Sequence, residues 1–138
     1  MSYTKTEEVI TATETRSKTF RRLEDWIGNK FESSYSKTPE FMAFAQMYRA
    51  RIRKIADKAG LEIVDWSTGG HFCVSAMLKN RQTGKFVYMS CSDVRHWRDG
   101  WYKDILVRTA EHKEDWTGGS NNSSTLEKLG EAFERLTR

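Results

Sequence analysis

The chain has 138 residues, enough for one domain with its own hydrophobic core. Aromatic residues make up 12% of it, a share that a disordered chain does not carry, so we expect most of it to fold. The net charge is +4, no apolar run could cross a bilayer, and the first residues lack the apolar core of a signal peptide, which together predict a cytoplasmic, weakly basic protein.

The N-terminal part divides into a polar arm and two helices. Residues 1–18 are rich in Thr, Ser, Glu and Lys and predict a flexible arm. Residues 19–32 carry apolar side chains at helical spacing and predict a first helix. Thr38 is a good N-cap, Pro39 suits a first helical position, and Gly60 suits a helix end, so the apolar stripe between them predicts a second helix.

After the second helix the apolar spacing becomes alternating, which indicates β-strands. Four strands are predicted, at residues 61–66, 71–79, 85–91 and 103–109. Consecutive strands joined by short turns favour an antiparallel meander. Residues 124–127 read Ser-Thr-Leu-Glu, a capping box that predicts the start of a final helix packed on the sheet. We therefore expect a single α+β domain over residues 19–138, with N-terminal helices, a four-stranded antiparallel β-meander and a C-terminal helix.

The second helix carries the first candidate binding surface. At 100° per residue, Arg51, Lys54 and Lys58 lie on one flank of its apolar stripe, and Arg49 and Arg53 lie on the other. Two rows of cations can straddle a phosphate backbone, since each cation near a phosphate releases counterions. The same pattern also fits a solvated helix face whose long side chains extend around the core.

The segment after the third predicted strand carries the second candidate surface. It interleaves basic and aromatic side chains: Arg95, Trp97, Arg98, Trp101 and Lys103. This mixture suits base stacking and cation–π contacts with nucleic acid. It equally suits a protein interface, where Trp, Tyr and Arg contribute most of the binding energy. Alternatively, Trp97 and Trp101 lie four residues apart and pack one face of a helical turn against the core.

Two cysteines are the only thiols in the chain. Cys73 and Cys91 are predicted on one face of the central hairpin, near His71. These three side chains are candidate metal ligands, but alternating strand positions rarely converge in a tetrahedron, so buried inert thiols are the preferred interpretation. A disulfide between them requires that they oppose each other directly. We expect no metal and no cofactor.

A scattered set of acid–base residues is the remaining chemical candidate. Asp93, His96, Asp99, His112 and Asp115 could serve a metal-dependent nuclease, which needs clustered carboxylates to hold its ions. No pair of them has the spacing of a known catalytic motif, and no glycine-rich phosphate loop followed by lysine occurs. We therefore expect a binding protein rather than an enzyme.

One segment and the general character of the chain resemble known proteins. Residues 106–122, Leu-Val-Arg-Thr-Ala-Glu-His-Lys-Glu-Asp-Trp-Thr-Gly-Gly-Ser-Asn-Asn, resemble a segment of small phage and plasmid proteins. In size, charged surface and lack of a catalytic motif, the chain is similar to anti-CRISPR proteins. The resemblance implies a non-catalytic inhibitor in the cytoplasm of a bacterial host cell. Its partner would be a CRISPR effector protein or that effector's complex with guide RNA or DNA.

The α-β-β-β-α portion from Pro39 onward also resembles the double-stranded-RNA-binding domain. That resemblance implies the alternative function, a nucleic-acid-binding regulatory protein of a mobile element. The chain departs from the pattern in an extra strand. It also has Ser124, Thr125 and Glu127 where lysines are expected at the start of the last helix. The sequence leaves the oligomeric state open.

Overall fold

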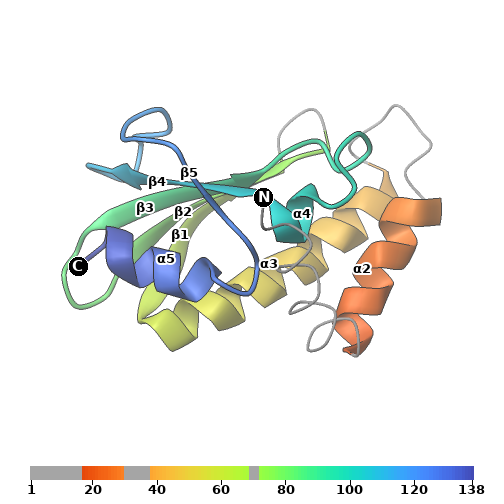
Figure 1. Cartoon of the computed structure of the whole chain (residues 1–138), viewed down its shortest axis with the longest axis horizontal. Helices are drawn as coiled ribbons and strands as arrows, with labels where there is room; N and C mark the ends of the chain where they lie inside the picture. Colours follow the sequence, from red (N-terminus) through yellow and green to blue (C-terminus); the bar gives the residue numbers. More distant parts are fainter. Residues whose placement is uncertain (1–16, 30–37, 69–71) are drawn as a thin grey trace.

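A computed structural model describes residues 17–29, 38–68 and 72–138 of the chain. The elements follow in the order α2 (Lys18–Asn29), α3 (Pro39–Ala59), β1 (Leu61–Ser67), β2 (Val74–Asn80), β3 (Phe86–Cys91), α4 (Gly100–Lys103), β4 (Ile105–Ala110), β5 (Asn122–Ser124) and α5 (Leu129–Leu136). The strands form one antiparallel sheet in the order β1-β2-β3-β4-β5. The helices lie along one face of this sheet, below it in Figure 1. The α+β class and the antiparallel meander are therefore confirmed.

Helix α3 is the long helix beneath the sheet, and both of its ends follow the sequence. The Oγ1 atom of Thr38 accepts a hydrogen bond from the backbone N–H of Phe41 (3.4 Å), with Pro39 in the first turn. Gly60 ends the helix with φ +86°, a left-handed conformation that favours glycine. The apolar stripe is buried: Phe41, Phe44, Ala45, Tyr48, Ile52 and Ala56. The prediction of this helix is confirmed.

The register of the strands separates a core face from an outer face. Val74, Cys91 and Ile105 form one buried row across three strands, and Ala76, Met89 and Val107 form the next. Burying each large aliphatic side chain contributes roughly 1.5–3 kcal/mol, so these rows hold the sheet on the helices. The edge strand β1 carries a bulge between Ile63 and Asp65, where the register to β2 shifts.

The outer face of the sheet is partly covered by residues 111–121, the blue loop above β4 in Figure 1. The ring of Trp116 meets the ring of Tyr88 edge-on at 5.6 Å between centroids. The guanidinium of Arg108 lies 4.8 Å from the Tyr88 centroid and donates to the Trp116 carbonyl (3.2 Å). This cluster anchors the loop to the sheet. Local sequence patterns do not reveal this cluster, because Tyr88 and Trp116 are far apart in the chain.

Two predictions about the C-terminal part are wrong. The sheet has five strands rather than four, because residues 122–124 pair with β4 although their Asn-Ser-Ser sequence has no apolar alternation. The capping box does not start the last helix, which begins at Leu129 without a side-chain cap. Instead, the backbone N–H of Leu126 donates to the backbone carbonyl of Tyr102 (2.7 Å). In the turn before α5, the Thr125 hydroxyl accepts a hydrogen bond from the backbone N–H of Lys128 (3.3 Å).

Other boundaries differ by a few residues or fall outside the described ranges. Strand β2 begins at Val74, later than predicted, because Phe72 has φ +56° and cannot extend the strand. Of the predicted arm, residues 1–16 lie outside the described residues, while Lys18 already opens α2. The predicted first helix continues to residue 32, and its residues 30–32 also lie outside them.

Gly119 is the glycine whose replacement we expect to be costly. It has φ +77°, and a Cβ atom there would collide with the backbone carbonyl of Thr109 on β4. We expect Gly119→Ala to lower the free energy of unfolding by about 2–4 kcal/mol, measured by urea unfolding, because strain and collision add. Gly84→Ala is the matched control, since Gly84 has the same φ of +77° but open space around it, and it should cost only about 1 kcal/mol. If both variants lose the same unfolding free energy, the backbone around Gly119 must shift enough to remove the collision with Thr109.

Candidate binding surface

The loop between β3 and α4 is a tightly bonded turn. The carboxylate of Asp93 accepts hydrogen bonds from the backbone N–H of Arg95 (2.9 Å) and from its guanidinium at Nε (3.1 Å) and Nη2 (2.7 Å). The backbone N–H of Trp97 donates to the backbone carbonyl of Asp93 (2.9 Å). Val94 is fully buried and donates to the Phe72 carbonyl (3.1 Å). These bonds hold the turn in one shape over the end of the sheet.

The Arg95 side chain contacts Asp93 of the same turn and the ring of Phe72. Burial alone would raise the pKa of Asp93, but the hydrogen bonds from Arg95 outweigh it and hold that pKa below its usual value. The guanidinium of Arg95 also lies 4.1 Å from the centroid of the Phe72 ring. Two nitrogens of the Arg95 guanidinium therefore donate inside the turn, and its plane lies against the Phe72 ring.

Trp97 stands out from this turn into solvent. Its side chain is 66% exposed, and of the large hydrophobic side chains in the described ranges only Met42, at 44%, is also exposed. A cavity of about 380 Å³ opens beside its ring. The cavity is lined by both signs of charge and by small polar groups: Ser92, His96, Arg98, Asp99, Gly100, Lys103 and Asp104. The sequence-predicted residues Trp97, Arg98 and Lys103 thus share one site.

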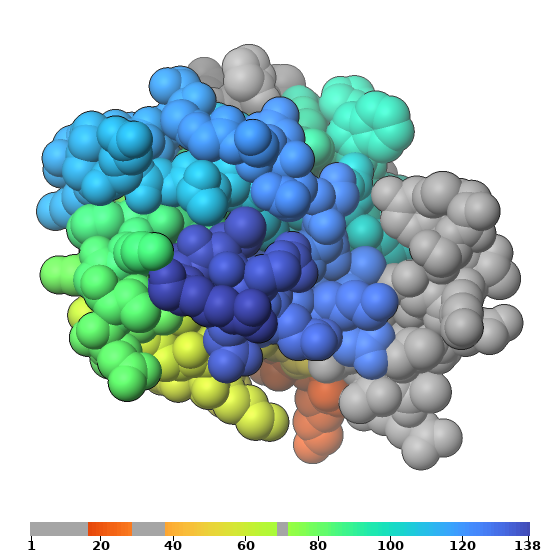
Figure 2. All heavy atoms as spheres, turned by 60° about the vertical axis from the view of Figure 1, so that its left-hand side comes forward, coloured from red at the N-terminus to blue at the C-terminus, as the bar shows by residue number. Residues whose placement is uncertain are grey.

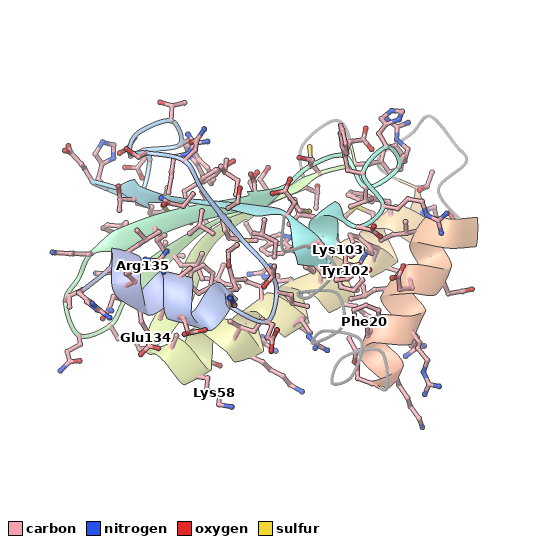
Figure 3. All side chains as sticks on the ribbon, in the orientation of Figure 1. Phe20, Lys58, Tyr102, Lys103, Glu134 and Arg135 are labelled. Carbon is pink, nitrogen blue, oxygen red and sulfur yellow. The ribbon has the colours of Figure 1, made fainter. Side chains whose placement is uncertain are left out.

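Helix α2 borders the same site from the side. Burial and the nearby carboxylate of Asp99 raise the pKa of Glu24, while Arg98 and Lys103 act in the opposite direction. The Nζ atom of Lys103 pairs with Asp99 at 3.0 Å, and only 11% of the Lys103 side chain is exposed. Figure 3 shows Lys103 on α4 close to the region of α2. Of the cations around the cavity, Arg98 is the exposed one and Lys103 is tied to its own helix.

Trp101 is not available to a partner. It is fully buried, and its ring centroid lies 4.9 Å from Phe20, 6.4 Å from Phe44 and 6.1 Å from Tyr48. The Tyr48 hydroxyl donates to the Trp101 backbone carbonyl (2.8 Å), which joins α4 to α3. The prediction that Trp101 contacts a partner is therefore wrong, and the alternative of core packing is correct for this residue. Four-residue spacing could not separate the two tryptophans because Trp97 precedes the short helix and Trp101 lies in it.

The basic residues of α3 lie elsewhere on the molecule. Arg51, Lys54 and Lys58 line a cavity of about 310 Å³ together with the apolar side chains of Met47 and Ile55. Burial lowers the pKa of Arg51, whose Nη1 lies 3.5 Å from the Ser17 hydroxyl. None of these residues lines the Trp97 cavity. The two predicted surfaces are thus two separate sites.

The opposite flank of α3 faces strand β1. The Arg49 guanidinium lies 5.8 Å from the Trp66 ring centroid. Arg53, on the same flank by the predicted geometry, is exposed. The two flanks that the sequence predicts are therefore both present at the surface.

The five acid–base residues do not converge. Asp93, His96 and Asp99 belong to the loop before β4, whereas His112 and Asp115 belong to the loop after it. Asp115 accepts hydrogen bonds from the backbone of Glu111 (2.9 Å) and Gly118 (2.8 Å), which closes that second loop. In residues 17–29, 38–68 and 72–138, no three His, Cys, Asp or Glu side chains gather where a metal ion could be held.

The two cysteines are free thiols in different surroundings. Cys91 pairs with Val74 in the sheet and shares its core face, so the prediction that Cys73 lies on the same face of the hairpin as Cys91 is wrong. Cys73 directly precedes Val74, the first residue of β2, and is half-buried. Burial raises the pKa of the Cys91 thiol to about 12. The third predicted metal ligand, His71, lies outside the described residues.

The buried thiol and the buried phenol of Tyr48 predict a loss of stability at high pH. Both have pKa values raised by burial, so the unfolded chain releases these protons first and stability is lost as the pH rises from about 8.5 toward 12. We expect unfolding free energy to fall by about 1.4 kcal/mol per pH unit for each group in its window. Cys91→Ala should remove the part that begins near pH 8.5, measured by urea unfolding across pH 7–10.5. Cys73→Ala is the control that should keep it, and equal slopes in all three proteins would contradict the assignment.

Comparison with known proteins finds no family model, no curated protein and no solved structure that matches this chain. None of the described helices combines the length and the apolar character needed to cross a bilayer.

Proposed function

We propose that the protein is a non-catalytic binding protein that attaches to a bacterial nucleoprotein effector of the CRISPR type and inhibits it. Trp97 and Arg98 form the centre of the contact. The partner is the effector protein or the effector with its guide RNA and DNA. This proposal joins the resemblance to anti-CRISPR proteins with the surface around Trp97.

The exposure of Trp97 is the observation that carries the proposal. An indole that is 66% exposed gains little from folding, while every other aromatic side chain in the described ranges is at least half-buried. Trp and Arg are the residue types that contribute most to protein interfaces, and a rigid support lowers the entropy cost of binding. The turn held by Asp93 and Arg95 supplies that support.

The test is inhibition of target-DNA cleavage by purified RNA-guided nucleases, assembled with guide RNA and taken from several CRISPR types. We expect one of them to be inhibited at a near-stoichiometric ratio and to co-elute with the protein in size-exclusion chromatography. If all of them cleave at the uninhibited rate and none co-elutes, the proposed target class is wrong.

A nucleic-acid-binding regulator is the second candidate, and the exposed cations on α3 favour it. We expect Arg49→Glu with Arg53→Glu to weaken binding to short labelled duplex RNA or DNA by roughly tenfold, because each lost phosphate contact lowers affinity. Fluorescence anisotropy at about 50 and about 200 mM salt measures both the affinity and its salt slope. The control is Lys85→Glu with Lys113→Glu, an equal charge change at exposed positions on the hairpin and loop. An unchanged affinity in the first variant would remove this flank as a contact.

A further inference from the structure

A groove runs along the helical layer between α3 and α5. One stretch of it, about 500 Å³, lies between the two helices, and a second stretch, about 310 Å³, continues along α3 toward α2. Arg51, Ile55 and Lys58 line both stretches, so the two adjoin each other along α3. Figure 2 shows α5, in dark blue, directly above the yellow end of α3.

The two edges of this groove carry opposite charges. The edge on α3 is formed by Arg51, Lys54 and Lys58, and we call it the basic edge. The edge on α5 and the turn before it is formed by Glu127, Glu131 and Glu134, and we call it the acidic edge. Figure 3 shows Lys58 and Glu134 on this same side of the molecule.

The floor of the groove is apolar and narrow. It contains Ile55 and Ala59 of α3 and Gly130 of α5. A Cβ atom at Gly130 would come within 3.7 Å of the Ile55 Cγ2 atom, so the two helices approach closely there. A half-buried Ile55 leaves apolar surface that a partner can cover.

In the described part of the chain, the two lysines of the basic edge and the three glutamates of the acidic edge have no ion-pair partner within 4.0 Å, whereas Arg51 lies 3.5 Å from the Ser17 hydroxyl. Lys54 and Lys58 on one edge and the glutamates on the other therefore put opposite charges along one apolar floor, a pattern that is complementary to itself. A two-fold axis that runs parallel to the groove places each basic edge against the acidic edge of the other copy.

We propose that this groove is the interface of a homodimer, occupied by a second copy of the same chain. Nucleic acid fits it less well, because the acidic edge repels phosphates. Helix α3 has 21 residues, about 30 Å at 1.5 Å per residue, which is long enough for one side of a two-fold contact. Because exposed charge pairs dominate it, we expect a weak dimer that dissociates as salt rises.

Sedimentation equilibrium of the full chain tests the proposal. At low salt, about 50 mM, we expect the mass to rise with concentration from 16.1 kDa toward twice that value, and at about 500 mM salt to return toward the monomer. Lys54→Glu with Lys58→Glu makes both edges acidic, and Glu131→Lys with Glu134→Lys makes both edges basic. Each variant alone should be monomeric, because like charges then face each other across the axis.

Mixing the two variants makes the test specific. We expect the mixture to form a heterodimer, and a chain with all four substitutions to dimerise again, because complementarity is restored. The pair Lys85→Glu and Lys113→Glu controls for net charge and should leave the dimer intact. A wild-type chain that stays monomeric at every concentration, or single-edge variants that still dimerise, would overturn the proposal. A monomer that binds duplex RNA through Lys54 and Lys58 would also overturn it and assign the basic edge to nucleic acid.

Discussion

Replacing Trp101 with alanine should lower the free energy of unfolding by about 3–5 kcal/mol and the Tm by roughly 10 °C. The indole is fully buried and touches aromatic rings from α2, α3 and α4. Its removal leaves a cavity where these helices meet, and cavities cost more than the lost transfer energy alone. Urea unfolding followed by circular dichroism measures the loss.

Trp101→Phe is the conservative partner of this variant. The indole Nε1 is buried, and within the described part of the chain it meets no acceptor, so phenylalanine sacrifices no hydrogen bond there. The smaller ring still reaches Phe20 and Tyr48, and we expect a loss of about 1–2 kcal/mol. A loss below about 1 kcal/mol in the alanine variant would mean that the core closes around the gap.

Replacing Trp97 with alanine should weaken binding to the inhibited effector by about 30-fold or more, equivalent to about 2 kcal/mol. The same change should alter the unfolding free energy by less than about 0.5 kcal/mol, because the side chain is mostly exposed and its turn is held by backbone bonds. Titration of the effector with the protein, read by residual DNA cleavage, measures the first effect. Urea unfolding measures the second.

Met42→Ala is the matched control for Trp97→Ala. Met42 is the other exposed large hydrophobic side chain in the described ranges, and it lies on α3 outside the Trp97 cavity. We expect this variant to inhibit as well as the wild type. Equal inhibition by both variants would move the contact away from Trp97, whereas a large stability loss in Trp97→Ala would make that residue part of the core.

Much of the fold follows from local sequence signals. Thr38, Pro39 and Gly60 mark the ends of α3 because capping and left-handed geometry depend on a few adjacent residues. Strand β5 could not be predicted, because its three polar residues join the sheet only through pairing with β4. The start of α5 could not be predicted either. The backbone N–H of Leu126 donates to the distant Tyr102 carbonyl, and the helix begins after the capping box, at Leu129.

The residue types of the candidate site could be predicted from the sequence, but which of those residues lie together at the surface could not. The mixture of Arg and Trp before β4 indicates a surface, but burial decides which of Trp97 and Trp101 takes part. Helical spacing correctly places Lys54 and Lys58 on one flank of α3. It cannot reveal the glutamates of α5 beside them, because those come from a distant part of the chain.

The two edges of the sheet limit how the protein can aggregate. Strand β1 has a bulge between Ile63 and Asp65. The Asp65 carboxylate accepts a hydrogen bond from the backbone N–H of Trp66 (2.9 Å), so this N–H is not offered to another strand. Strand β5, at the other edge, is three residues long. Neither edge offers a long flat ladder to which a foreign strand could add. Concentrated solutions should therefore resist fibril growth, and association should proceed through helical faces instead.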